Sequence, residues 1–400
     1  MSTRTAVPRY RSHAGPALFR QGFRPFFLAA GLWGAAAVPL WLLVFLGGLE
    51  VPTAFDPMAW HAHEMIFGFA AAVVTGFLLT AIPNWTGRLP LQGLPLAGLF
   101  AIWIAGRAAV AASLVIGVWP AAAVDLAFLV LLMAVALREI VAGRNWRNLP
   151  LMGALLLLIT ANALMHLAAA GVADTAQTGE RLGIAVLAML IGLIGGRIIP
   201  SFTRNWLVKR GATALPAAFG LYDKLCLLAS LVGLAAWVAA PELVLTGAAL
   251  LAAGALQLAR LARWEGRQTL AEPLVWVLHL GFLWLPLGLI LLGFAVLLPT
   301  LLPATAGLHA LTAGAVGSMT LAVMTRATLG HTGRELRADV ATTAIYLAVA
   351  AAAATRVAAA AVPEAYTVLL WGSGLLWTLA FGLFVLRYGR LYLTHGPASH

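Results

Sequence analysis

The sequence contains few charged residues and almost no cysteine. Only 10% of its 400 residues are Asp, Glu, Lys or Arg, whereas 62% are hydrophobic, and the mean hydropathy is +0.94. A soluble domain of this length needs a charged surface, so these values exclude a soluble protein and indicate an integral membrane protein. The single cysteine, Cys226, excludes a disulfide framework or a thiolate metal cluster within one chain.

The alternation of polar and apolar residues that is typical of strands is also missing. A chain in lipid must satisfy its own backbone hydrogen bonds, so the absence of this pattern leaves helices as the expected structure. The sequence has no Gly-rich phosphate loop after a strand and no arguable Ser/His/Asp arrangement. Its apolar runs hold too few carboxylates for an ion-coupled pump.

The sequence does contain a long series of apolar runs, each about 20 residues long, which is the length that spans a hydrocarbon core. We count twelve and predict an all-α membrane protein with one domain: a cytoplasmic segment 1–25, a twelve-helix bundle 26–388 and a cytoplasmic tail 389–400. The predicted spans are 26–49, 60–82, 91–113, 119–141, 150–172, 181–206, 217–240, 242–264, 272–298, 303–329, 339–361 and 364–388.

The net charge of +11 reflects topology rather than nucleic-acid binding. Basic residues cluster at alternate ends of successive runs, and the opposite loops carry mainly Asp and Glu. By the positive-inside rule, both termini are cytoplasmic, and the partner of this surface is membrane lipid. The basic clusters begin at Arg4, Arg88, Arg138, Arg204, Arg260, Arg326 and Arg387.

Three similar segments lie four spans apart, at the ends of the second, sixth and tenth spans. They read TGFLLTAIPNWTGR, IGLIGGRIIPSFTRN and LAVMTRATLGHTGR, and each ends with a Thr and an Arg. This repetition predicts three units of four helices. The alternative, two halves of six helices as in many transporters, would usually show a long central cytoplasmic loop, whereas segment 204–216 is short.

Histidines within the spans are the main candidates for a site, because polar groups in the membrane are costly and usually functional. A rise of about 1.5 Å per residue places four of them, from three helices, in one outer layer and two more toward the cytoplasm. Neutral imidazole binds haem iron, copper and zinc, although a histidine can instead bond a backbone carbonyl or a helix end. The outer four are His61, His63, His166 and His309, and the other two are His279 and His331.

The motif WHAHEM at the start of the second span contains two of these histidines. His61 and His63 are two residues apart, which places them about 200° apart around a helix, so one helix can serve two sites. Glu64 follows directly and is a candidate catalytic acid, or an acceptor that orients an imidazole. We take His61, His63, His309, His279 and His331 as candidate metal ligands.

Two arginines lie in the outer half of spans, against the positive-inside trend. Arg107 and Arg356 each need an anionic partner if they are buried. The propionates of a haem would supply one through bidentate contacts, and Asp125 in the fourth span is the alternative partner. Both arginines are therefore candidate cofactor-binding residues, together with His61, His63, His166 and His309.

Four segments carry a resemblance to a known family. RPFF at 24–27, WHAHEMIFGFAAAVVTGFLLTAIPNWTG at 60–87, GGRIIPSFTRN at 195–205 and HALTAGAVGSMTLAVMTRATLGHTGR at 309–334 resemble the NnrS family. The resemblance covers nearly the whole chain. It implies a twelve-span protein of the bacterial inner membrane that is associated with haem and copper and with the response to nitric oxide.

The predicted architecture is also loosely similar to the catalytic subunits of haem-copper oxidases and nitric oxide reductases. In that superfamily, histidines on the second and tenth helices bind haem, and the matching positions here are His61, His63 and His309. The seventh span lacks a His-His pair and the sixth lacks histidine, so an oxidase-like copper site is not supported. Any copper must use other ligands.

The resulting hypothesis is that His61 or His63, with His309 and His166, holds one or two b-type haems in the outer half of the membrane. Such a protein can reduce nitric oxide to nitrous oxide, with a quinol or a cytochrome as electron donor and Glu64 as a proton source. Two alternatives stay open. One is a transporter or copper-handling carrier, and the other is a sensor or scavenger that binds nitric oxide without turnover.

Overall fold

A computed structural model describes residues 15–394, and over this range the chain forms twelve helical spans and no strand. The all-α prediction is confirmed. The spans are α1 (Phe23–Phe45); α2 (Pro57–His63) to α3 (Ala71–Thr86); α4 (Leu94–Ala111); α6 (Val118–Ala142); α7 (Pro150–Ala169); α8 (Ala176–Leu190) to α9 (Gly196–Val208); α10 (Leu221–Ala239); α11 (Val244–Ala262); α12 (Pro273–Leu297); α13 (Ala304–His309) to α14 (Gly317–His331); α15 (Val340–Ala361); and α16 (Tyr366–Leu393).

The predicted boundaries differ from the observed ones by at most five residues. The sixth span begins at Ala176 rather than at 181, and the last helix continues to Leu393 rather than ending at 388, so the tail begins later than predicted. A short helix, α5 (Ser113–Ile116), joins the third and fourth spans. The predicted terminal segments lie partly outside the described residues, at 1–14 and 395–400.

The second, sixth and tenth spans form the centre of the bundle. In their most apolar windows, 78%, 61% and 72% of residues are buried, against 33% to 50% in the other nine described spans. Each of the three also contains a π-helical segment: η2 (Glu64–Ala70), η4 (Ile191–Gly195) and η6 (Ala310–Val316). π segments inside helices are rare and often mark functional positions, and their recurrence at a spacing of four spans supports three related units.

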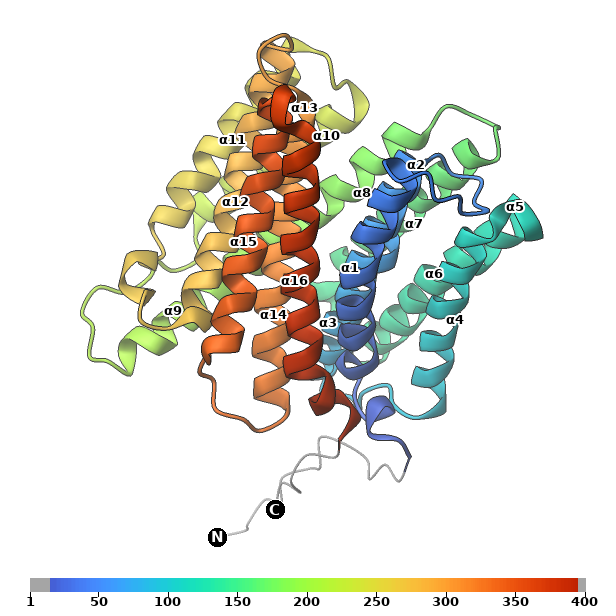
Figure 1. Ribbon diagram of the computed structural model, residues 1–400. Helices are drawn as coiled ribbons and strands as arrows, with labels where there is room; N and C mark the ends of the chain where they lie inside the picture. Colours follow the sequence, from blue (N-terminus) through green and yellow to red (C-terminus); the bar gives the residue numbers. More distant parts are fainter. Residues whose placement is uncertain (1–14, 395–400) are drawn as a thin grey trace.

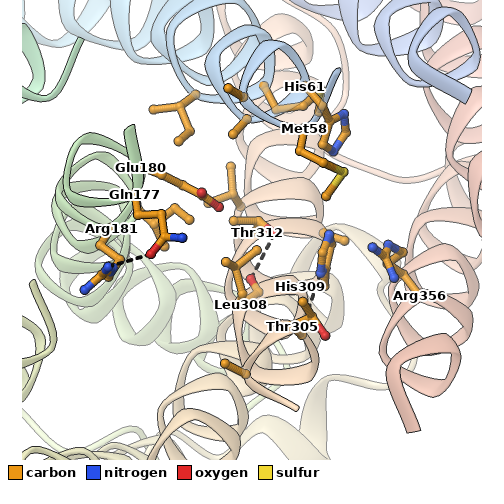
Figure 2. A pocket seen from close by; sticks show the side chains of 18 of the residues that line it. Met58, His61, Gln177, Glu180, Arg181, Thr305, Leu308, His309, Thr312 and Arg356 are labelled. Carbon is orange, nitrogen blue, oxygen red and sulfur yellow. Dashed lines mark hydrogen bonds between the residues drawn. The ribbon is translucent and has the colours of Figure 1, made fainter. Parts of the chain in front are cut away.

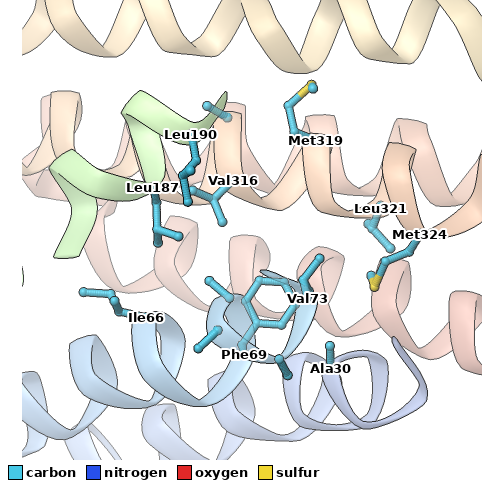
Figure 3. Packing of buried hydrophobic residues seen from close by; sticks show 14 of the residues in the cluster. Ala30, Ile66, Phe69, Val73, Leu187, Leu190, Val316, Met319, Leu321 and Met324 are labelled. Carbon is cyan, nitrogen blue, oxygen red and sulfur yellow. The ribbon is translucent and has the colours of Figure 1, made fainter. Parts of the chain in front are cut away.

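Most outer spans pack against their neighbours in the chain, and α1, at the start of the chain, packs against α16 at its end (Figure 1). Apolar side chains from all three central spans meet inside the bundle, among them Ile66, Phe69, Leu187 and Val316 (Figure 3). Lipid tails are as apolar as the outer faces of the helices, so the hydrophobic effect does not drive the helices together in a membrane. Close packing between their side chains holds the bundle together instead.

The second span begins at a well-defined helix cap. The side chain of Asp56 accepts hydrogen bonds from the backbone N–H groups of Met58 and Ala59, at 2.9 and 3.0 Å, and Pro57 occupies the first helical position. This combination fixes a helix start. The cap therefore places His61 and His63 within the first two turns of the span, at the end of the bundle opposite Phe23 and Leu393, here called the distal end (Figure 1).

The opposite, proximal end carries the predicted basic clusters that begin at Arg88 and later, whereas the cluster at Arg4 lies outside the described residues. Asp339 is an anionic partner at this end. Its carboxylate accepts hydrogen bonds from the Thr342 backbone N–H and hydroxyl, at 2.8 and 2.6 Å, and pairs with Arg387 at 2.6 Å. Partial burial alone would raise the pKa of Asp339, but these contacts lower it from its ordinary value of 3.8 to about 2. The cytoplasmic location of the proximal end stays a prediction.

Candidate metal and cofactor sites

A cavity of about 950 Å³ opens at the distal end, between the central helices and α1, α15 and α16. Its wall is mostly apolar, and it includes His61, His309 and Arg356 on one side and Gln177, Glu180 and Arg181 on another (Figure 2). Binding cavities for small molecules and cofactors range from roughly 300 to 1,000 Å³. The volume of this cavity therefore lies at the upper end of that range.

The two histidines of the cavity have ring nitrogens available for a ligand. The ring of His309 bonds the carbonyl oxygen of Thr305 through Nδ1, at 2.8 Å. A carbonyl only accepts, so Nδ1 carries the proton and Nε2 keeps a free lone pair. His61 stacks on Trp41 with ring centroids 4.2 Å apart, and its buried Nδ1 has no hydrogen-bond partner among the described residues.

Arg356 adds a positive charge to the same cavity. Its side chain is 7% exposed, its Nη1 has no hydrogen-bond partner, and within residues 15–394 no carboxylate forms an ion pair with it. A buried guanidinium without a counter-charge is costly, so the arrangement favours an anionic group in the cavity.

His63 points away from the cavity, into a cluster of buried polar side chains, here called the buried network, formed by His63 and Glu64 with Arg107, Asp125, Asn162 and His166. As predicted from the spacing, His61 and His63 thus serve opposite sides of one helix. The ring of His63 contacts Glu64 Oε1 through Nδ1 at 3.2 Å, and through Nε2 it contacts Asp125 Oδ2 at 3.1 Å and Asn162 Oδ1 at 2.9 Å.

The remaining contacts of the buried network bring together the second, third, fourth and fifth spans. Arg107 donates to Glu64 Oε1 at 2.6 Å and to Asp125 Oδ1. Asp125 Oδ2 also contacts His166 Nε2 at 3.0 Å and accepts from Asn162 Nδ2 at 2.8 Å. All six side chains are at most 6% exposed. Such polar networks are stable in an apolar interior only when nearly every member is paired.

The sequence left two possible anionic partners for Arg107, a haem propionate and Asp125, and these contacts identify Asp125. Asp125 and Glu64 neutralise Arg107, which does not belong to the cavity wall, so the structure does not support a role at a haem propionate for Arg107. Glu64 likewise lies in the buried network rather than in the wall, and its catalytic role stays a prediction.

The histidines predicted to share one outer layer therefore form two groups on either side of α2. His61 and His309 line the cavity, whereas His63 and His166 lie in the buried network. His279 bonds the Thr203 hydroxyl through Nε2 at 2.8 Å. The remaining one, His331, lies against Phe23 at the proximal end, with ring centroids 5.5 Å apart.

Within residues 15–394, one group of His, Cys, Asp and Glu side chains is close enough to hold a metal ion. Its donor atoms, on His63, Asp125 and His166, lie within 4.8 Å of one another and all three residues are buried. Neither His279 nor His331 belongs to such a group in the described part of the chain. The network can therefore bind a metal on the side of α2 that faces away from the cavity.

Sequence reasoning missed Asn162, which joins both Asp125 and His63. A signal existed, because Asn162 and His166 are four residues apart and so share one face of α7. Trp41 was also missed, since a tryptophan in a span is more often an interfacial or packing residue.

Comparison with known proteins agrees with this architecture. The family described as NnrS protein matches residues 17–395, which is nearly the whole chain. The chain therefore belongs to the NnrS family of membrane proteins, which is linked to the response to nitric oxide. No curated protein matches the chain at a significant level.

Proposed function

We propose that this member of the NnrS family binds a b-type haem in the distal cavity through His61 and His309 and acts in nitric oxide metabolism. The observation that carries the proposal is that two central helices each supply a histidine with an available nitrogen to one cavity of about 950 Å³. Imidazoles are the common axial ligands of haem iron in membrane cytochromes and globins alike.

Two further features of the cavity fit a haem. Its wall is mostly apolar, as a porphyrin face requires, and Arg356 supplies a buried cation whose Nη1 is unpartnered. The carboxylate of a propionate would satisfy this guanidinium through charge-assisted hydrogen bonds. We propose one haem in this cavity, and the buried network is the candidate location for a second metal.

The bound haem would supply electron transfer and binding of the gas. Nitric oxide is small and apolar enough to concentrate in lipid, so the apolar cavity wall admits it without a polar channel. Of the two histidines that would hold the haem, His309 is fixed by its hydrogen bond to Thr305, whereas Nδ1 of His61 has no hydrogen-bond partner among the described residues. Reduction of two nitric oxide molecules by two electrons and two protons gives nitrous oxide and water, with a quinol or cytochrome as donor.

The experiment that tests this proposal is an absorption spectrum of the purified protein and of three histidine variants. We expect a Soret band in the parent protein, its loss or a strong shift in His61→Ala and His309→Ala, and no change in His331→Ala. The last variant is a matched control because His331 lies at the proximal end, against Phe23. Circular dichroism confirms that each variant is folded, and an unchanged spectrum in both cavity variants would refute the ligand assignment.

Gas measurements separate an enzyme from a sensor or scavenger. If the protein is an enzyme, its reduced form consumes nitric oxide for as long as the electron donor lasts and releases nitrous oxide. A sensor or scavenger takes up the gas until its sites are filled and releases none.

A carrier of copper or of another cation is the second candidate. The cavity wall includes four carboxylates, Asp56, Asp174, Glu180 and Glu242, which would attract a cation from the distal side. A purified protein that is colourless and holds no haem would favour this function over the first.

A further inference from the structure

We propose that the buried network binds one divalent transition-metal ion, at a site separate from the haem cavity. The ligands are His63 Nε2, His166 Nε2 and Asp125 Oδ2, with the side-chain oxygen of Asn162 as the fourth. This proposal does not depend on the presence of haem, because α2 lies between the two sites and each uses its own side chains.

The donor atoms lie slightly closer together than the ligands of a single ion would. Asp125 Oδ2 is 3.1 Å from His63 Nε2 and 3.0 Å from His166 Nε2, and Asn162 Oδ1 is 2.9 Å from His63 Nε2. Metal–ligand bonds of about 2.0–2.2 Å in a tetrahedral site place neighbouring ligand atoms roughly 3.3–3.6 Å apart. A shift of a few tenths of an ångström in each side chain would therefore admit an ion at the centre.

The charge of the buried network also calls for a cation. With both imidazoles neutral, the carboxylates of Glu64 and Asp125 outnumber the single guanidinium of Arg107. An uncompensated negative charge is costly in a site where every member is at most 6% exposed. Two imidazoles aim Nε2 at one carboxylate oxygen, and this common point is where a positive charge gains most.

Glu64 orients His63 for metal binding. Its Oε1 accepts from His63 Nδ1 at 3.2 Å, and it is itself held by Arg107 at 2.6 Å. Without a metal, Nε2 of His63 donates its proton toward Asp125 Oδ2 and Asn162 Oδ1. With Nδ1 still donating to Glu64, loss of the Nε2 proton would leave the lone pair that binds an ion. A metal-bound histidine usually donates its other N–H to a carboxylate in this way.

The donor types indicate which ions fit. Two imidazole nitrogens, a carboxylate oxygen and an amide oxygen suit borderline ions such as Zn²⁺ or Cu²⁺. The site offers no sulfur ligand, which a soft monovalent ion would prefer. We therefore assign the divalent class rather than a monovalent ion.

Phe55 covers the distal side of this site. Its ring is 5% exposed and contacts both histidines, with centroids 4.9 Å from His63 and 5.3 Å from His166. Phe55 belongs to the loop before α2, so an ion would leave only after this side chain moves. We expect slow metal exchange that becomes faster in Phe55→Ala, with no change in the number of ions bound.

The experiment uses full-length protein in detergent, treated with a chelator and then titrated with Co²⁺ and, separately, with Zn²⁺. The visible bands of tetrahedral Co²⁺ report the geometry, and elemental analysis gives the number of ions per chain. We expect one ion in the parent protein and in His279→Gln, and a loss of affinity of more than about 100-fold in His166→Gln and Asp125→Asn. His279→Gln is the matched control, since His279 is a buried histidine outside the network.

Two outcomes would overturn the proposal. If folded parent protein takes up no ion, a proton carries the missing positive charge instead. If His166→Gln and Asp125→Asn bind the ion as the parent does, the ion lies elsewhere. The variant His309→Ala distinguishes the two proposals. It should lose or shift the haem bands if the haem assignment is right, whereas the cobalt bands of the buried network should not change.

Discussion

The strongest energetic prediction concerns Arg107, which joins two carboxylates inside the membrane. Replacement by Gln keeps much of the volume but removes the positive charge, leaving Glu64 and Asp125 buried without it. Removing one partner of a buried ion pair costs about 3–5 kcal/mol. We therefore expect Arg107→Gln to reduce the free energy of unfolding by about 4 kcal/mol, or roughly a thousandfold in the folding equilibrium.

The same reasoning predicts a partial rescue. Adding Asp125→Asn to Arg107→Gln removes one charge of each sign, so the double variant should be more stable than Arg107→Gln alone. The expected coupling between the two sites is about 1–3 kcal/mol. Reversible unfolding by sodium dodecyl sulfate in mixed micelles measures all three variants on one scale.

Arg88→Gln provides the matched control. Arg88 also pairs with a carboxylate, that of Glu139 at 2.5 Å, but its side chain is 44% exposed. Exposed pairs contribute less than about 1 kcal/mol, because solvent screens them. The reasoning fails if Arg107→Gln costs no more than Arg88→Gln, or if the two single substitutions at the buried pair are simply additive.

Two further predictions test the proximal and distal ends. The pKa of Asp339 is lowered to about 2 from 3.8, so its contribution to stability is present above about pH 4 and is lost as the pH falls through 2. Melting temperatures between pH 5 and 2 should therefore fall less in Asp339→Asn than in the parent. At the cavity, Ser373→Asp would give Arg356 a counter-charge from the protein, so the fraction of protein that keeps its haem should fall at least tenfold. Ser373→Asn adds no charge and should keep the haem as the parent does. Equal haem content in the two variants would contradict the role of Arg356.

The sequence was sufficient to predict the spans, because span length and hydropathy depend on the chain alone. The opposite directions of His61 and His63 also followed from helix geometry. Depth along a helix, however, placed His166 and His309 in one layer without indicating which side of α2 each would face. That depends on the order of helices around the centre, which brings α7 to one side of α2 and α13 to the other.

The pairing of charges was harder to predict than their presence. Arg107 and Arg356 look alike in the sequence, since each is a lone arginine in the outer half of a span. The structure distinguishes them, because Asp125 and Glu64 reach Arg107 whereas no described carboxylate pairs with Arg356. Neither Asn162 nor the π segments have a sequence signature as strong as the hydropathy that reveals the spans.

The difference between the two arginines can be traced to one position in the neighbouring helices. His63 and His309 each directly precede a π segment, and Arg107 and Arg356 each lie on the helix that follows in the chain. Asp125, which neutralises Arg107, is the eighth residue of α6, counted from Val118, and the eighth residue of α16, counted from Tyr366, is Ser373.

In both places a histidine before a π segment is followed by an arginine in the next span, but Ser373 stands where the other place has the carboxylate of Asp125. Ser373 lines the distal cavity, as Arg356 and His309 do. Asp125 thus neutralises Arg107 within the buried network, whereas Arg356 faces the cavity without an ion-pair partner among the described residues. Under the proposed function, a propionate of the haem would supply the counter-charge that Arg356 lacks.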